Sequence, residues 1–279
     1  MNQQRPSLEL KKNLQDKYVA YIDVLGFKNL VSGGSVKELE SYFTKILEVL
    51  DKLRAEKSRI ESFLISDAII LISPQDPQGL RDIILATRRI QSALLWQKIL
   101  LRGAISYGQV FYDKMNNIIV GQGFVKAYLL EQEAVHPRVL LDPSIIKQVA
   151  DDRKAFVNLI QKTAGNEFDD RLIYKKSGFS KISDDCIFVD YANKSVLQMS
   201  INNNISKVYD LIHSHLYGDQ KLYSKYVWLR DYFLEWLEVT NLNLEASYKM
   251  AELMKSKVSP ATLKQHRDIR IWLDKFSRL

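Results

Sequence analysis

The sequence predicts an α+β fold: a ferredoxin-like sandwich of helices on an antiparallel-rich sheet, followed by a helical C-terminal region. Short runs rich in β-branched and aromatic residues alternate with amphipathic stretches in the order strand, helix, two strands, helix, strand, helix, strand. From about residue 196 the strand signals vanish and helical periodicity replaces them. We therefore divide the chain into a polar N-terminal arm (1–15), a core domain (16–195) and a helical region (196–279).

The first half of the core supplies a strand, a helix and a hairpin. Residues 18–24 form a strongly apolar run, which the breakers "GFKNLVSGG" end. Ser35 and Glu38 then have capping-box spacing, which marks a helix start. The apolar residues of that helix recur at helical intervals: Leu39, Phe43, Ile46, Leu50 and Leu53. Residues 60–73 divide into two short strands about the pair Ser66 and Asp67, so we expect a hairpin there.

The second half continues the alternation. We expect a helix over 78–99, a strand over 100–113, a short strand and helix over 118–134, and strands over 137–145 and 186–192. The stretches at 207–216, 225–241 and 260–276 carry the helical periodicity of the C-terminal region.

Composition limits the class of protein. With 46% hydrophobic and 26% charged residues the 279-residue chain is globular, and its net charge of +7 suits an anionic ligand without requiring nucleic acid. The basic residues are scattered and no recognition motif occurs, so no nucleic-acid partner is expected. The single cysteine, Cys186, suits a reducing compartment. Neither a signal peptide nor an apolar run of membrane-spanning length is found, so we expect a cytoplasmic protein with no membrane partner.

Two aspartates carry the strongest chemical signal. Asp23 sits in an apolar strand, and Asp67 sits at the turn of the predicted hairpin. If adjacent strands bring them together, the two carboxylates repel unless a cation lies between them, which favours a divalent metal site. A hydrogen-bonded carboxylate and an ordinary turn residue would explain the same spacing more simply.

The backbone after Asp23 suits a polyphosphate. Leu25, Gly26 and Phe27 lead directly into a predicted helix start, where free amides and the positive helix end attract phosphate. A metal site beside a phosphate cradle points to a nucleoside triphosphate as substrate.

Four motifs, in order and over about residues 16–145, resemble the class III nucleotidyl cyclases. The family's D-I-x-G-F is matched by "IDVLGF" at 22–27, and its I-G-D by "ISD" at 65–67. Its R-x-G-I-H-x-G is partly matched by "RGAISYG" at 102–108, and the helix G-D-T-V-N-V-A-A-R-L-E by "GQGFVKAYLLE" at 121–131, which keeps Gly121, Ala127, Leu130 and Glu131.

The resemblance implies a mechanism. Two divalent ions, Mn²⁺ or Mg²⁺, would be held by Asp23 and Asp67 with the backbone carbonyl of Val24. The ribose 3′-oxygen would attack the α-phosphorus and release pyrophosphate. Such enzymes work as head-to-tail dimers, so a homodimer with composite active sites is implied. Arg102 is the third catalytic candidate, and it, Lys175, Lys126 or Lys176 would contribute positive charge to the phosphates.

The departures from the family pattern concern the base and the transition state. Val125 and Leu129 stand where purine cyclases have the asparagine and arginine that orient ribose and stabilise the transition state, and Phe63 replaces a lysine that reads the purine. In this the chain resembles the pyrimidine cyclases of bacterial Pycsar antiphage defence, which make cUMP from UTP, or cCMP from CTP, for a separate effector. A purine cyclase, an inactive cyclase-like binding or dimerisation module and a nucleic-acid-binding protein remain as alternatives.

Overall fold

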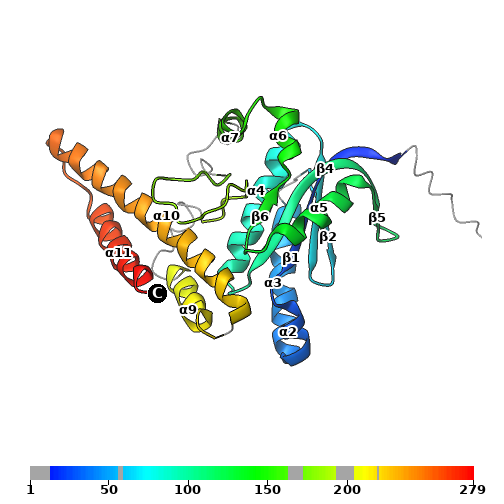
Figure 1. Cartoon of the computed structure of the whole chain (residues 1–279), viewed down its shortest axis with the longest axis horizontal. Coiled ribbons are helices and arrows are strands. Elements are labelled where there is room, and N and C mark those ends of the chain that lie inside the picture. Colours follow the sequence, from blue (N-terminus) through cyan, green and yellow to red (C-terminus); the bar gives the residue numbers. More distant parts are fainter. Residues whose placement is uncertain (1–12, 56–58, 163–171, 193–203, 219) are drawn as a thin grey trace, which may run out of the picture.

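The structure is a computed structural model that describes residues 13–55, 59–162, 172–192, 204–218 and 220–279 (Figure 1). Most of the predicted polar arm and the predicted domain boundary at residues 195 and 196 lie outside these ranges. Within them, no helix is both long and apolar enough to cross a membrane.

A mixed sheet forms the centre of the core, in the strand order β2-β3-β1-β4-β5 with β6 also on β4. Its first four strands pair in antiparallel fashion, whereas β6 runs parallel to β4. This arrangement of β1 to β4 and their two connecting helices is the predicted ferredoxin-like pattern, and the α+β fold class is confirmed. The strands are β1 (Gln15–Val24), β2 (Glu61–Ile65), β3 (Ala68–Pro74), β4 (Leu101–Asp113), β5 (Ile118–Val120) and β6 (Val139–Leu141).

Helices cover the two faces of the sheet unequally. One face packs against α3 (Val36–Ala55) and α4 (Pro77–Leu95), whose apolar residues share a buried cluster with β1 and β3. The other face packs against α5 (Gln122–Glu133) through a smaller cluster around Val19, Ile70 and Ala127. The predicted capping box is present, because Glu38 accepts from the Ser35 amide at 2.7 Å and Ser35 Oγ accepts from the Glu38 amide at 3.3 Å.

Two predicted strands differ from the structure. The strand predicted over 137–145 ends at Leu141, because Asp142 caps the helix α6 (Pro143–Val149) by accepting from the Ser144 amide, with proline at the first turn. The segment predicted as a strand over 186–192 makes only isolated bridges, Leu140 with Phe188 and Ile173 with Val189. A further helix, α7 (Arg153–Lys162), was not anticipated.

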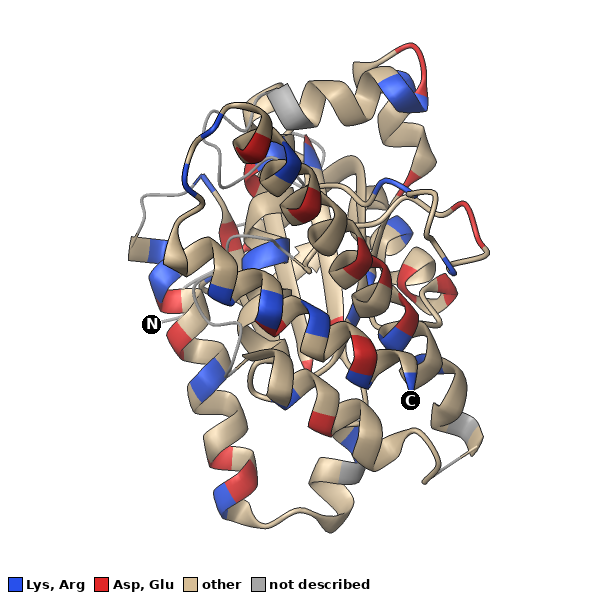
Figure 2. Ribbon diagram, turned by 90° about the vertical axis from the view of Figure 1, so that its left-hand side faces the viewer, with Lys and Arg blue, Asp and Glu red and all other residues tan. Residues whose placement is uncertain are grey.

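The C-terminal region is helical, as predicted, and packs on the core. It consists of α9 (Ser206–His215), α10 (Gln220–Leu253) and α11 (Pro260–Ser277). A cluster of buried aromatic residues of α10, namely Tyr226, Trp228, Tyr232, Phe233 and Trp236, joins these helices to β4, β6 and residues 174–192. Tyr232 accepts hydrogen bonds from the amides of Tyr191 (3.0 Å) and Ala192 (2.9 Å) and donates to the buried Asp190 carboxylate. Basic and acidic residues are interspersed along these helices rather than sorted into a basic face (Figure 2).

Candidate active site

Three parts of the core meet at one end of the sheet. Asp23 lies at the end of β1 and pairs in register with Arg102 at the start of β4. Asp67 lies in the turn between β2 and β3, where Ser66 adopts a left-handed conformation with φ of 56°. Because β3 is the other neighbour of β1, this turn comes beside Asp23, as the sequence predicted.

The surroundings of Asp23 disfavour its charge. Burial raises the pKa of Asp23, and the nearby Asp67 carboxylate raises it further. The Arg102 guanidinium, whose Nη2 lies 3.4 Å from Asp23 Oδ2, acts in the opposite direction. Asp23 is therefore costly to ionise, chiefly because it is buried, and a cation placed beside it would favour its charged form.

Arg102 is shared with a third carboxylate. Its Nε lies 2.6 Å from Oε1 of Glu131, on a residue that is only 3% exposed. Burial raises the pKa of Glu131, and Asp23 and Asp67 raise it further, while Arg102 lowers it. Arg102 thus bridges Asp23 and Glu131, which fixes the guanidinium at the edge of the site. Glu131 was noted only as a motif match, and the sequence did not indicate that it reaches Arg102.

Close packing of α5 on β4 brings Glu131 into place. A Cβ on Gly108 would lie 2.9 Å from the Gly123 amide nitrogen, so the helix and the strand approach more closely than side chains would allow. Ser106 Oγ donates to the Gly123 carbonyl at 2.6 Å and fixes the register between them. These contacts lie near the start of α5, and Glu131 lies two turns further along the same buried face.

The turn after Asp23 has the predicted shape but fewer free amides than expected. Gly26 adopts φ of 84°, which glycine tolerates best, and the short helix α2 (Phe27–Gly33) begins directly after it with no side-chain cap. The Phe27 ring packs 5.3 Å from the ring of Tyr42, which anchors the turn to α3. The Leu25 amide, however, donates to the Leu100 carbonyl at 2.9 Å. The expectation of a free amide at Leu25 is therefore wrong, and the uncapped first turn of α2 provides the donors that remain.

Tyr42 is a polar group of this region that the sequence analysis missed. Its residue is 4% exposed, yet its hydroxyl has no hydrogen-bond partner among the described residues. Burial raises its pKa, and Asp67 and Asp23 contribute to the rise. Its spacing from Ile46 and Leu50 is helical and would have revealed its burial. The predicted pattern placed Phe43, which is only partly buried, on that face instead.

Other predicted site residues lie elsewhere. Phe63 is 8% exposed and packs on Tyr112 with ring centroids 5.9 Å apart. Val125 and Leu129 lie on the outer face of α5, 51% and 55% exposed. Lys175 is not brought together with the carboxylates: it lines a separate cavity beside α7, at the opposite end of the sheet from α2 (Figure 1).

The donor set at Asp23 and Asp67 fits a hard divalent cation. Mg²⁺ and Mn²⁺ prefer carboxylate, carbonyl and water oxygens, and Mg²⁺ is usually held by one or two carboxylates together with substrate phosphates. In the described part of the chain no group of three or more His, Cys, Asp or Glu residues has metal-binding geometry. Asp23, Asp67 and the Val24 carbonyl therefore suit an ion that a phosphate substrate helps to hold, rather than an ion enclosed by protein alone.

Comparison with known proteins adds likeness of fold. No family model matches the sequence, and no curated protein matches it. Among solved structures, the adenylyl cyclase CyaB from P. aeruginosa is 15% identical with a TM-score of 0.41, over 65% of this chain and 96% of that one. The guanylyl cyclase Cya2 is 14% identical with a TM-score of 0.41, over 64% of this chain and 93% of that one. A monomeric guanylyl cyclase domain from Blastocladiella emersonii is 16% identical with a TM-score of 0.38, over 48% of this chain and 84% of that one. At such identities and scores the likeness carries no functional conclusion.

Proposed function

We propose that this protein is a metal-dependent nucleotide cyclase of the class III type, acting on a pyrimidine nucleoside triphosphate, UTP before CTP. The observation that carries the proposal is the meeting of Asp23, Asp67 and Arg102 beside the glycine turn into α2. These residues come from three of the four cyclase-like motifs, and Glu131, which pairs with Arg102, comes from the fourth.

Different residues of the chain would bind the metal ions and the phosphates of a triphosphate and stabilise the charge on it. Asp23, Asp67 and the Val24 carbonyl would hold two divalent ions, whose chemistry is to favour the 3′-alkoxide and neutralise phosphate charge. The first turn of α2 has no side-chain cap, so its amides would be available to the terminal phosphates. Arg102, held in place by Glu131, adds a fixed positive charge at the edge of the site. The 3′-hydroxyl would release its proton to water, and its oxygen would form a bond to the α-phosphorus as the bond from the α-phosphorus to pyrophosphate breaks.

We propose a pyrimidine substrate because the residue at the position that reads the base in purine cyclases has no polar group. Phe63 offers no hydrogen-bond donor or acceptor where a purine-reading lysine is expected, and its ring is already packed against Tyr112. A purine with its extra polar edge atoms would gain nothing from this residue. By the same family resemblance we propose that the cyclic product signals to a separate effector in antiphage defence.

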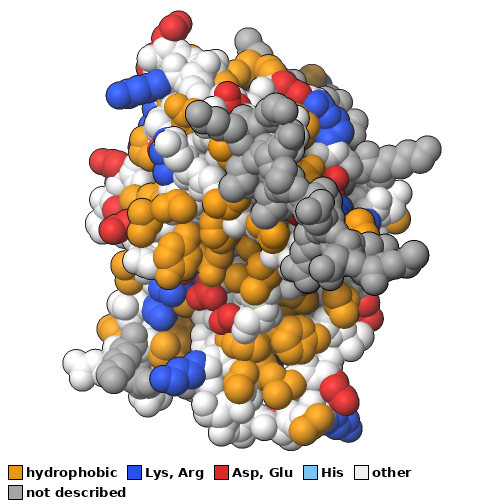
Figure 3. All heavy atoms as spheres, turned by 90° about the vertical axis from the view of Figure 1, so that its right-hand side faces the viewer, with side chains coloured by type: hydrophobic (Ala, Val, Ile, Leu, Met, Phe, Trp, Pro, Cys, Tyr) orange, Lys and Arg blue, Asp and Glu red, His pale blue; other side chains and the backbone are white. Residues whose placement is uncertain are grey.

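The outer face of α5 supports a homodimer with composite sites. Val125, Tyr128 and Leu129 are 51%, 42% and 55% exposed and lie on one side of this helix. The face of the molecule in Figure 3 carries gathered hydrophobic side chains interrupted by only a few charges. A second copy covering α5 would bury these residues and place its own groups near Asp23.

One assay tests the proposal. The protein is incubated with ATP, GTP, CTP or UTP and Mn²⁺, and the products are separated by chromatography. We expect a cyclic pyrimidine product that Asp67→Asn abolishes. Asp51→Asn, at an exposed carboxylate on α3 paired with Arg54, serves as the matched control and keeps activity. Turnover of purine triphosphates alone would replace pyrimidine by purine specificity.

A second candidate function is an inactive cyclase-like module. The positions of Val125 and Leu129 favour it, because neither side chain can orient ribose or stabilise charge. No product with any of the four triphosphates, together with retained self-association, would support this candidate.

A further inference from the structure

The far end of α10 extends beyond the core. The buried residues described for this helix all lie between Tyr226 and Thr240, and none of its residues from 241 to 253 is buried. At a rise of about 1.5 Å per residue, this second part of the helix is about 20 Å long. It runs beside α11, since the Tyr248 hydroxyl donates to the Thr262 carbonyl at 3.0 Å, and the two helices project together away from the sheet (Figure 1). We call the end of this helical pair, residues 249–263, the hairpin tip.

The backbone of the hairpin tip is ordered. Just beyond α10, Lys255 has a left-handed φ of 50°, and its amide donates to the Glu252 carbonyl at 3.0 Å. Ser259 caps α11 by accepting from the Thr262 amide at 3.1 Å. These hydrogen bonds close the turn between the two helices, so the turn presents its side chains in a fixed arrangement.

Large apolar side chains are exposed on the hairpin tip. Met250, Leu253 and Met254 are 56%, 80% and 72% exposed, and their spacing places them on one side of the end of α10. Leu263, in the first turn of α11, is half-exposed. Because the fold leaves this group of side chains unburied, it is suited to contact with another surface.

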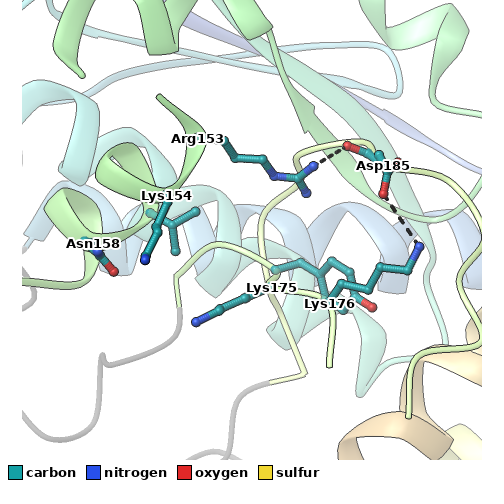
Figure 4. A pocket seen from close by; sticks show the side chains of 8 residues that line it. Arg153, Lys154, Asn158, Lys175, Lys176 and Asp185 are labelled. Atoms are coloured by element: carbon teal, nitrogen blue, oxygen red, sulfur yellow. Dashed lines mark hydrogen bonds and ion pairs between the residues drawn. The ribbon is translucent and has the colours of Figure 1, made fainter. Parts of the chain in front are cut away.

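The hairpin tip is also basic. No hydrogen bond or ion pair joins its lysine side chains to any other of the described residues. The basic residues beside α7 differ, since Lys176 Nζ lies 3.6 Å from Asp185 and Arg153 donates to the Asp185 carbonyl (Figure 4). The tip lysines are therefore available to an external anion. The tip has three lysines and one acidic residue, a net charge of +2: Lys249, Lys255, Lys257 and Glu252.

Exposed apolar groups among lysines favour an anionic lipid surface as the partner. A projecting end can meet a broad surface, and apolar side chains can enter the boundary between lipid headgroups and acyl chains. Lysine stems lie along such a boundary while their ammonium groups reach the lipid phosphates. A second copy of this chain is disfavoured, because a two-fold contact between tips would bring two charges of +2 together.

We propose that the hairpin tip docks the protein on an anionic membrane surface. Leu253 and Met254 enter the interface, and the three lysines lie at the level of the lipid phosphates. The expectation that the chain has no membrane partner rested on the lack of a signal peptide and of a spanning segment, which does not bear on binding at a membrane surface. The proposal is independent of the cyclase activity.

Vesicle flotation with the full chain tests it. The vesicles contain phosphatidylcholine alone or with about one-third phosphatidylglycerol, at low ionic strength. We expect binding only to the anionic vesicles, and we expect added salt to weaken it. Each basic residue near such a surface contributes about fivefold to the affinity, so Lys255→Gln/Lys257→Gln should raise the lipid concentration for half-maximal binding at least tenfold. Leu253→Ser/Met254→Ser should also raise it at least tenfold, because the apolar contact is lost.

Matched control variants change the same residue types on α3. Lys37→Gln/Lys52→Gln removes two exposed lysines. Val36→Ser/Leu47→Ser replaces two exposed apolar residues. Both should change the half-maximal lipid concentration less than twofold. Thermal unfolding of the two tip variants should match that of the wild type, since none of the side chains changed in them is buried.

Four results would overturn the proposal. The first two are no binding of the wild-type chain to anionic vesicles, and equal binding by the tip variants and the controls. The third is tighter binding to poly(glutamic acid) than to the vesicles, lost in the same tip variants, which would assign the tip to an acidic protein. The fourth is a wild-type oligomer that forms without lipid and dissociates in the tip variants, which would assign the tip to a second copy of this chain.

Discussion

Replacing Asp67 by asparagine should stabilise the metal-free protein while abolishing its response to divalent ions. Two unit charges about 4 Å apart at an effective dielectric constant of about 20 repel by about 4 kcal/mol. The Arg102 guanidinium, 3.4 Å from Asp23, offsets much of this repulsion. We therefore expect a net gain of about 1 kcal/mol in the free energy of unfolding for Asp67→Asn in EDTA, or about 2 °C in Tm.

In the presence of a divalent metal the wild-type protein should be more stable than Asp67→Asn, which is the opposite of the order in EDTA. At a concentration about 100 times its Kd, Mn²⁺ would stabilise the wild-type protein by about 2.7 kcal/mol through mass action. Asp67→Asn removes a ligand and should show almost none of this gain. Thermal unfolding by circular dichroism, with and without Mn²⁺, measures both effects, and Asp51→Asn should follow the wild type in each. An Asp67→Asn protein that unfolds at a lower temperature than the wild type in EDTA, and gains as much from Mn²⁺, would refute the paired-carboxylate site.

The extra stability that Asp67→Asn has over the wild type in EDTA should increase with pH. The folded pKa of Asp23 is raised, so ionisation of Asp23 destabilises the metal-free protein as the pH rises through that pKa. The advantage of Asp67→Asn in EDTA should therefore be full at neutral pH and should disappear at pH values below the ordinary pKa of aspartate. Unfolding curves at a series of pH values measure it. An advantage that grows on acidification would contradict the assigned cause.

Three further predictions concern single groups. Calorimetry should show that more Mn²⁺ is needed to half-saturate the protein as the pH falls, because Asp23 must release its proton to bind metal. Since the pKa of Asp23 is raised, this loss of affinity should begin at a higher pH than for an ordinary pair of carboxylates. Tyr42→Phe should leave the free energy of unfolding in EDTA unchanged or slightly higher, since the lost hydroxyl has no partner, but should lower turnover; equal turnover would exclude Tyr42 from the site. Tyr232→Phe should cost about 1–3 kcal/mol in urea unfolding by removing a donor from buried Asp190, whereas Tyr217→Phe, at an exposed hydroxyl, should cost almost nothing.

Local chemistry was predictable from the sequence, whereas contacts between distant segments were not. The capping box at Ser35 and the turn at Asp67 depend on a few neighbouring residues, and both were found as predicted. The ion pair of Arg102 with Glu131 depends on how closely α5 packs on β4, which no local pattern encodes. Lys175 is a similar case, because its distance from Asp23 follows from the path of the chain after β6. Even a local signal was overlooked at Asp142, where an apolar run concealed the start of a helix.

Helix α5 contributes both to the candidate active site and to the exposed surface of the protein. Its inner face holds Glu131 against Arg102, and its outer face exposes Val125 and Leu129. In the cyclase-like pattern, an asparagine and an arginine at these two positions would orient ribose and stabilise the transition state. Valine and leucine cannot do either, but they give this face of the helix an apolar surface suited to contact with another protein surface. A protein that keeps Asp23, Asp67 and Arg102 while making this exchange would have to obtain its remaining transition-state contacts from other residues. Lys126, whose Nζ lies 5.0 Å from the centroid of the Tyr107 ring, is a cation on the same helix for that role. Activity in the triphosphate assay that is lost in Lys126→Gln, but kept in Lys264→Gln, would identify it.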